Sequence, residues 1–112
     1  MRPLLRRKRL RFGTPRPGPL RCPSHLAWVR GHVCAVPGCI SPDIEAAHVR
    51  TGTDGGLSSK PSDCWAIPLC STHHRLQHLI GERQFQGSHG IDLKEIAVDL
   101  WRRSHHRQRE AG

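Results

Sequence analysis

The sequence predicts a small α+β domain that is held together by a bound zinc ion, and three observations support this prediction. Only 36% of the 112 residues are hydrophobic and 4% are aromatic, so the chain has little material for a core. Cysteine and histidine residues occur in two pairs at spacings typical of zinc ligands. The middle of the chain reads as strand, loop, strand and helix. A domain with so small a core usually needs a metal ion or a disulfide for stability.

The first half of the chain is expected to contain one helix and one strand. A short helix is predicted over residues 23–31, because Ser24 suits an N-cap and Gly31 suits a helix end. A strand is predicted over residues 44–49. The polar segment 51–62, rich in Gly, Ser and Thr, is expected to be a loop.

The second strand and the helix after it are expected to follow this loop directly. A strand is predicted over residues 64–69, and Pro68 indicates an edge strand or a strand end. A helix is predicted over residues 72–80, with Ser71 as its N-cap and Gly81 as its end.

The last helix carries the clearest local signals. Asp92 and Glu95 form a variant of the capping box, and Ile91 and Ile96 are placed for a hydrophobic staple. Apolar residues recur on one face of this helix and are expected to be core: Leu93, Ile96, Ala97, Leu100 and Trp101. The polar tail, residues 102–112, is expected to fray. The folded domain is therefore predicted over residues 23–101.

The net charge of +9 belongs mostly to the N-terminal arm. Residues 1–21 contain eight Lys and Arg residues and no acid, whereas the other 91 residues contain ten basic and nine acidic residues. Residues 1–22 also hold four prolines, and we expect them to form a basic, disordered arm. Such an arm strengthens binding to a phosphate backbone without sequence preference. Its removal is expected to weaken nucleic-acid binding and to leave any chemistry intact.

Four residues are predicted to bind structural zinc. Cys34 and Cys39 enclose four residues, and Cys70 and His73 enclose two, which together give three thiolates and one imidazole. The alternative, buried free cysteines, does not account for the paired spacing. The chain has an odd number of cysteines, no apolar leader and no membrane-length apolar stretch. We therefore expect a cytoplasmic protein with no membrane partner.

The segments between and after these ligands resemble the HNH endonucleases, whose ββα-metal (His-Me finger) unit consists of two strands, a connecting loop and a helix. The resemblance rests on Glu45-Ala46-Ala47-His48-Val49-Arg50, then Lys60-Pro61-Ser62-Asp63, then Ile67-Pro68-Leu69-Cys70-Ser71-Thr72-His73-His74, with His78 one turn later. It covers residues 22–101. The chain is most similar to small zinc-stapled HNH proteins of phages and prophages, including Ref-like nucleases.

The resemblance implies a role for several residues. His48 falls at the position of the general base, and His74 at the helix histidine that binds a catalytic divalent metal, Mg²⁺ or Mn²⁺, with Zn²⁺ or Ni²⁺ as alternatives. His78 matches a second helix ligand found in some members. Asp63 is the nearest candidate for the loop-ordering role of the usual asparagine, because the chain contains no Asn. A neutral imidazole is well suited to accept a proton from water near neutral pH.

The position before the base departs from the family pattern. Many members have a further metal ligand there, and this chain has Ala47. The metal would then rest on the two helix histidines with water and phosphate oxygens, or would borrow Glu45. Basic residues near the predicted site are expected to contact phosphates: Arg50, Lys60 and Arg75.

Two functions remain open at this point. The first is a metal-dependent endonuclease of low sequence specificity that hydrolyses DNA phosphodiester bonds, including single-stranded or branched DNA, in a bacterial host of a phage or prophage. The second is a zinc-stapled nucleic-acid-binding or recombination accessory protein without catalysis. In either case a phage recombination or packaging protein is a potential partner.

Overall fold

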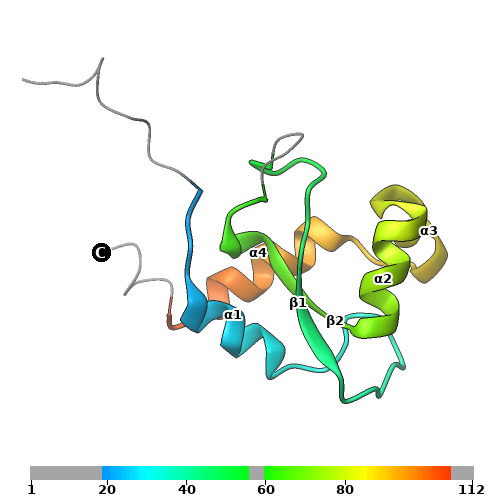
Figure 1. Cartoon of the computed structure of the whole chain (residues 1–112), viewed down its shortest axis with the longest axis horizontal. Coiled ribbons are helices and arrows are strands. Elements are labelled where there is room, and N and C mark those ends of the chain that lie inside the picture. Colours follow the sequence, from blue (N-terminus) through cyan, green and yellow to red (C-terminus); the bar gives the residue numbers. More distant parts are fainter. Residues whose placement is uncertain (1–18, 56–59, 107–112) are drawn as a thin grey trace, which may run out of the picture.

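The computed structural model describes residues 19–55 and 60–106, and the predictions for the rest of the arm and for the end of the C-terminal tail lie outside these residues. It confirms a small α+β domain with one two-stranded sheet and four helices in the described ranges (Figure 1). The elements are α1 (Pro23–Arg30), β1 (Ile44–His48), the 3₁₀ turn η1 (Asp63–Trp65), β2 (Ala66–Cys70), α2 (Ser71–Ile80), α3 (Glu82–His89) and α4 (Leu93–Arg103).

The sheet places the end of β1 beside the start of β2. The two strands are antiparallel, with His48 opposite Ala66 and Ala46 opposite Pro68. In this two-stranded sheet each strand has one free edge. The backbone of Pro68 faces the free edge of β2, so its missing N–H removes no hydrogen bond to β1, and the prediction of an edge strand is confirmed. The Pro68 carbonyl accepts a hydrogen bond from the amide of Ala35 at 2.8 Å. This bond ties the loop after α1 to β2.

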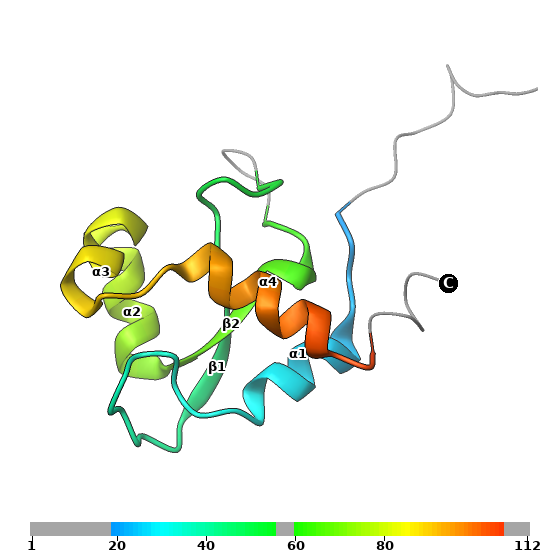
Figure 2. The same ribbon diagram turned by 180° about the vertical axis from the view of Figure 1, so that it is seen from behind.

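The hydrophobic core lies on one face of the sheet. Ala47 and Ile67 point into it together with Leu93 and Ala97 of α4, and all four are fully buried. Figures 1 and 2 show α4 crossing this face, whereas α2 and α3 lie together at one end of the domain and α1 lies at the other. Because successive strand residues face opposite ways, the neighbours of Ala47 in β1 point to the other face.

Two helix starts differ from the predictions. Helix α1 begins at Pro23 after Cys22, so Ser24 lies inside the first turn and is not the N-cap. Helix α2 begins at Ser71, and its N-cap is Cys70, whose sulfur accepts a hydrogen bond from the His73 amide. The sequence alone favours a hydroxyl cap over a thiol. The tertiary structure brings Cys70 into the capping position because the same sulfur belongs to a ligand cluster.

The second strand is shifted by two residues from its predicted start. Residues 63–65 form η1, and the strand runs over 66–70 in place of 64–69. Asp63 fixes this turn because its side chain is held by three donors, described below. The last helix begins as predicted, with Asp92 accepting a hydrogen bond from the Glu95 amide at 3.0 Å, but it continues to Arg103.

Helix α3 was not predicted. It follows α2 after a single residue, Gly81, whose φ of +86° is a backbone conformation that favours glycine. Its sequence contains Gly87, and Phe85 is its one buried residue, so apolar periodicity gives no signal. Within the described ranges, none of the helices has the length and apolar character needed to cross a bilayer.

Candidate metal centre and adjoining histidine site

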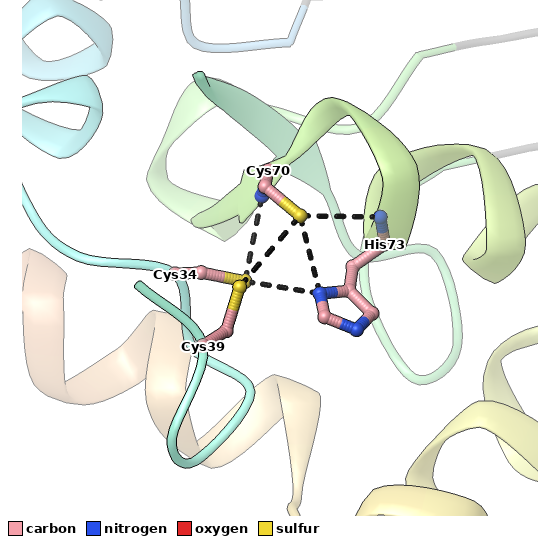
Figure 3. A group of neighbouring side chains, drawn as sticks. All are labelled: Cys34, Cys39, Cys70 and His73. Carbon is pink, nitrogen blue, oxygen red and sulfur yellow. Dashed lines mark hydrogen bonds between the residues drawn. The ribbon is translucent and has the colours of Figure 1, made fainter. Parts of the chain in front are cut away.

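Four ligand side chains meet where the loop after α1 approaches the start of α2. Figure 3 shows the side chains of Cys34, Cys39, Cys70 and His73 pointing toward one another. One ligand atom from each lies within 4.8 Å of the others. The prediction that these residues come together is confirmed. They lie close enough to hold a metal ion.

The spacing of the ligand atoms fits a tetrahedral zinc ion. Around such an ion, two sulfurs lie about 3.8 Å apart, and a sulfur and a nitrogen about 3.6 Å apart. The Sγ atoms of Cys39 and Cys70 are 3.9 Å apart, and His73 Nδ1 lies 3.5 Å from Cys34 Sγ and 3.2 Å from Cys70 Sγ. The set is therefore consistent with structural zinc.

Backbone amides donate to the ligand sulfurs; burial raises the pKa of the Cys34 thiol, and the hydrogen bond from the Cys70 amide opposes this effect. The amide of Cys70 donates to the Cys34 sulfur at 3.4 Å, and the amide of His73 donates to the Cys70 sulfur at 3.4 Å. A hydrogen bond from the Ser41 backbone lowers the pKa of the Cys39 thiol. The strand end, the helix N-terminus and the loop after α1 thus jointly supply the centre.

A second group of predicted residues meets on the other face of the sheet. His48 Nε2 lies 2.8 Å from Asp63 Oδ1, and Asp63 is 2% exposed. A carboxylate only accepts hydrogen bonds, so Nε2 carries the ring proton and Nδ1 carries the lone pair. Asp63 thus orients the ring of His48 and fixes its tautomer.

Opposing effects set the ionisation of this pair. Burial lowers the pKa of His48 and outweighs the opposing effect of Asp63, and the charges of Lys60 and Arg21 lower the pKa further. Burial alone would raise the pKa of Asp63, but hydrogen bonds from His48 and the Cys22 amide lower it. A neutral imidazole beside an ionised carboxylate is therefore the form expected near pH 7.

His74 and His78 form a pair of imidazoles on α2. Their Nε2 atoms are 3.3 Å apart, and the Nδ1 atom of His74 is 2.7 Å from Glu45 Oε1. Glu45, considered above as a metal ligand, therefore holds the far side of the His74 ring. Histidine ligands of metal ions commonly have a carboxylate in this position.

The two histidine groups line one hollow of about 410 Å³ in the protein surface. Its lining consists of Leu26, Ala46, His48, Arg50, Lys60, Pro61, His74 and His78. Of the three basic residues expected to meet phosphates, Arg50 and Lys60 line the hollow. Arg75 is exposed on α2 but is not among the lining residues.

Ala47 stands at the position where the sequence departs from the family pattern by lacking a further metal ligand. Its side chain is fully buried in the core, whereas Ala46 and His48 line the hollow. Among the described residues, a set of three or more metal-ligand side chains forms only at the Cys34, Cys39, Cys70 and His73 centre. The pair on α2 has no third protein ligand in this part of the chain.

Glu82 is a residue of the site that the sequence did not reveal. Its two carboxylate oxygens accept hydrogen bonds from the amides of Arg50 and Thr51, each at 2.8 Å, and one oxygen also accepts from Gln77 Nε2 at 3.2 Å. It therefore fixes the chain just after His48. Glu82 belongs to α3, and neither its spacing nor its neighbours in the sequence point to this role.

The histidines outside these two groups include one that is fully buried. His25 packs between Trp28 and Trp101, and its Nδ1 atom lies 2.9 Å from Ser104 Oγ. Burial, with a smaller contribution from His106, lowers the pKa of His25 to about 4. His25 is therefore a neutral core residue.

The fold and the metal centre define a small α+β domain with a Cys₃His cluster. Residues 9–105 match a family described as "Protein of unknown function (DUF968)". The match covers most of the chain, which therefore belongs to this family. No curated protein and no solved structure matches the chain.

Proposed function

We propose that this protein is a metal-dependent DNA endonuclease of the HNH type, with zinc in the Cys₃His centre and a second divalent ion at the pair on α2. One observation carries the proposal: His48, oriented by Asp63, lines the same hollow as His74 and His78. A base and a metal-binding pair facing one space are what phosphodiester hydrolysis requires.

The distance between the paired nitrogens supports a metal site. Two nitrogens bound to one tetrahedral ion lie about 3.3 Å apart, which is the separation of the Nε2 atoms of His74 and His78. Because His74 Nδ1 donates its proton to the Glu45 carboxylate, the Nε2 lone pair of His74 is available. Two imidazoles suit Zn²⁺ or Ni²⁺, whereas Mg²⁺ or Mn²⁺ would depend more on the oxygen ligands. Water and phosphate oxygens would complete the coordination.

The reaction follows from the tautomer of His48. Its Nδ1 atom takes a proton from a water molecule as the water oxygen bonds to phosphorus. The bond between phosphorus and the 3′ oxygen breaks, and that oxygen takes a proton from solvent, which leaves 5′-phosphate and 3′-hydroxyl ends. A divalent ion bound at the α2 pair would stabilise the negative charge on the phosphate and on the leaving oxygen. Arg50 and Lys60 are placed to contact phosphates.

The test is nicking of supercoiled plasmid in Mg²⁺, Mn²⁺, Ni²⁺ or Zn²⁺, with single-stranded and branched DNA as parallel substrates. His48→Ala is expected to lower the rate about 100-fold or more, with zinc content unchanged. His105→Ala, at an exposed histidine of the same chain, is the matched control. A His48→Ala protein that cuts as fast as wild type would remove the base assignment.

Chelators strip both metals, so substitutions on α2 separate the two sites. His74→Ala and His78→Ala are expected to lose activity and keep one zinc per chain. If no metal supports nicking by wild type and DNA binding persists, the second candidate function applies: a zinc-stapled DNA-binding or recombination accessory protein. The missing third ligand near the α2 pair favours that candidate.

A further inference from the structure

The root of the basic arm is part of the folded domain. Pro19–Cys22 runs alongside Lys60–Asp63, contrary to the expectation of disorder through residue 22. The amide of Asp63 donates to the Leu20 carbonyl at 2.9 Å, and the amide of Leu20 donates to Ser62 Oγ at 2.9 Å. These bonds join the arm to the loop that leads into η1.

Arg21 makes the most extensive contacts in this region. Its guanidinium donates to the carbonyls of Pro61 at 2.6 Å and Lys60 at 3.1 Å, and to Asp63 Oδ1 at 3.3 Å. The amide of Cys22 donates to the other carboxylate oxygen, Asp63 Oδ2, at 2.8 Å. The carboxylate that orients His48 is therefore held on its other sides by two consecutive residues of the arm root.

We propose that Arg21 is a positioning residue of the His48 site, which makes the arm root a working part of that site. This inference rests on the proposed function and deepens it. Arg21 acts through Asp63, which sets the ring of His48, and through the carbonyl of Lys60, whose side chain lines the hollow.

The chemistry of the guanidinium explains why arginine suits this position. Asp63 is almost completely buried, and a buried carboxylate needs its charge compensated by hydrogen bonds and by a nearby cation. Arg21 supplies the cation while its fork reaches two carbonyls of the adjacent loop, which a lysine ammonium matches less well. With this compensation in place, His48 does not have to become the cation, so its ring remains a base.

Arg21 therefore has a role distinct from that of the other arm charges. Removal of residues 1–21 would delete both, so on this proposal such a truncation would lower the rate of the chemistry as well as the binding. Substitutions in the full-length chain separate the two roles. Arg21→Gln removes the contact with Asp63, whereas glutamine at four positions lowers the arm charge by four: Arg6, Arg7, Lys8 and Arg9.

Steady-state nicking kinetics test the proposal, with the metal ion that best supports wild type. Arg21→Gln is expected to lower kcat about tenfold or more with KM changed less than about twofold. The arm variant with four substitutions is expected to have a higher KM that depends less on salt concentration, with kcat within about twofold of wild type. Arg102→Gln, at an exposed position in the last turn of α4, controls for loss of one charge.

If Arg21→Gln raises KM and leaves kcat unchanged, as is expected of the arm variant, the proposal is overturned. If Arg21→Gln binds less zinc than wild type, Arg21→Lys takes its place, with the same expected fall in kcat. If the wild-type protein does not nick DNA, the proposed function fails. NMR of the ring nitrogens of His48 then still tests whether Arg21 positions the His48 ring. The Nε2–H tautomer is expected in wild type and Arg102→Gln, and a mixture of tautomers in Arg21→Gln. An unchanged spectrum would overturn it.

Discussion

Replacement of Cys70 by serine is expected to unfold the domain, because this residue serves the metal centre and two secondary-structure elements at once. Its sulfur lies 3.9 Å from the Cys39 sulfur and 3.2 Å from His73 Nδ1, as expected for ligands of one ion. The same sulfur caps α2, and the Cys70 amide donates to the Cys34 sulfur. Serine offers a poor ligand for zinc at neutral pH. The substitution therefore removes one of three thiolates together with the helix cap.

The expected loss exceeds the stability of a domain this small. Zinc contributes about 10–16 kcal/mol to the folding of small zinc domains near pH 7. Total stabilities of about 5–15 kcal/mol are usual for single domains. The lost cap adds about 1 kcal/mol to the cost. A chain that no longer binds zinc is therefore expected to be largely unfolded at 25 °C.

The assay combines zinc content per chain with far-UV circular dichroism and urea unfolding. Cys70→Ser is expected to contain no zinc and to show no cooperative transition. Cys64→Ser is the matched control, because Cys64 is half-buried and lies outside the cluster. It should keep one zinc and lose about 1 kcal/mol or less. A Cys70→Ser protein with the wild-type spectrum, midpoint and zinc content would refute the assignment of this centre.

Three further substitutions give distinct outcomes. Glu82→Ala should leave two backbone amides after β1 without their acceptor, lowering kcat in nicking assays; an unchanged kcat would show that the end of β1 needs no such anchor. Glu45→Gln should weaken metal binding at His74 about tenfold by calorimetry with zinc content unchanged, and unaltered affinity would contradict an orienting role. The pKa of His25 falls from 6.5 unfolded to about 4 folded, so the unfolded state binds more protons between these values, and stability is lost as pH falls. Between pH 7.5 and pH 5, the free energy of unfolding in urea should fall by about 2 kcal/mol more in wild type than in His25→Leu. Equal decreases in the two proteins would exclude this linkage.

The sequence revealed the residues whose roles depend on local spacing. Cys70 and His73 lie within one helical turn and Cys34 and Cys39 within one loop, so each pair is recognisable before the fold is known. Asp92 as an N-cap was equally local, and the structure confirms it. Antiparallel pairing places the start of β1 beside Cys70, and the bond from the Ala35 amide to the Pro68 carbonyl brings the loop that carries Cys34 and Cys39 to β2.

The parts that the sequence did not reveal depend on contacts between distant segments. Glu82 contacts residues about thirty positions earlier, and Arg21 reaches Asp63 across 42 positions. Helix α3 has one buried residue and an internal glycine, so its stability comes from packing and not from propensity. Cys70 became a helix cap because its sulfur was already held in place by the ligand cluster. Such roles become visible only once the chain is folded.

The adjacency of His73 and His74 has a consequence for how the protein responds to metal supply. Neighbouring helical residues point about 100° apart, so one turn of α2 directs one imidazole into the Cys₃His centre and the next toward Glu45 and the hollow. Any rotation of this turn would therefore move His74 together with His73. Under the function proposed above, the two sites would form a one-way hierarchy, in which loss of zinc from the Cys₃His centre disables the histidine pair, whereas loss of the second metal leaves the centre intact. On that proposal, a cell short of zinc would hold this protein inactive even with ample magnesium or manganese.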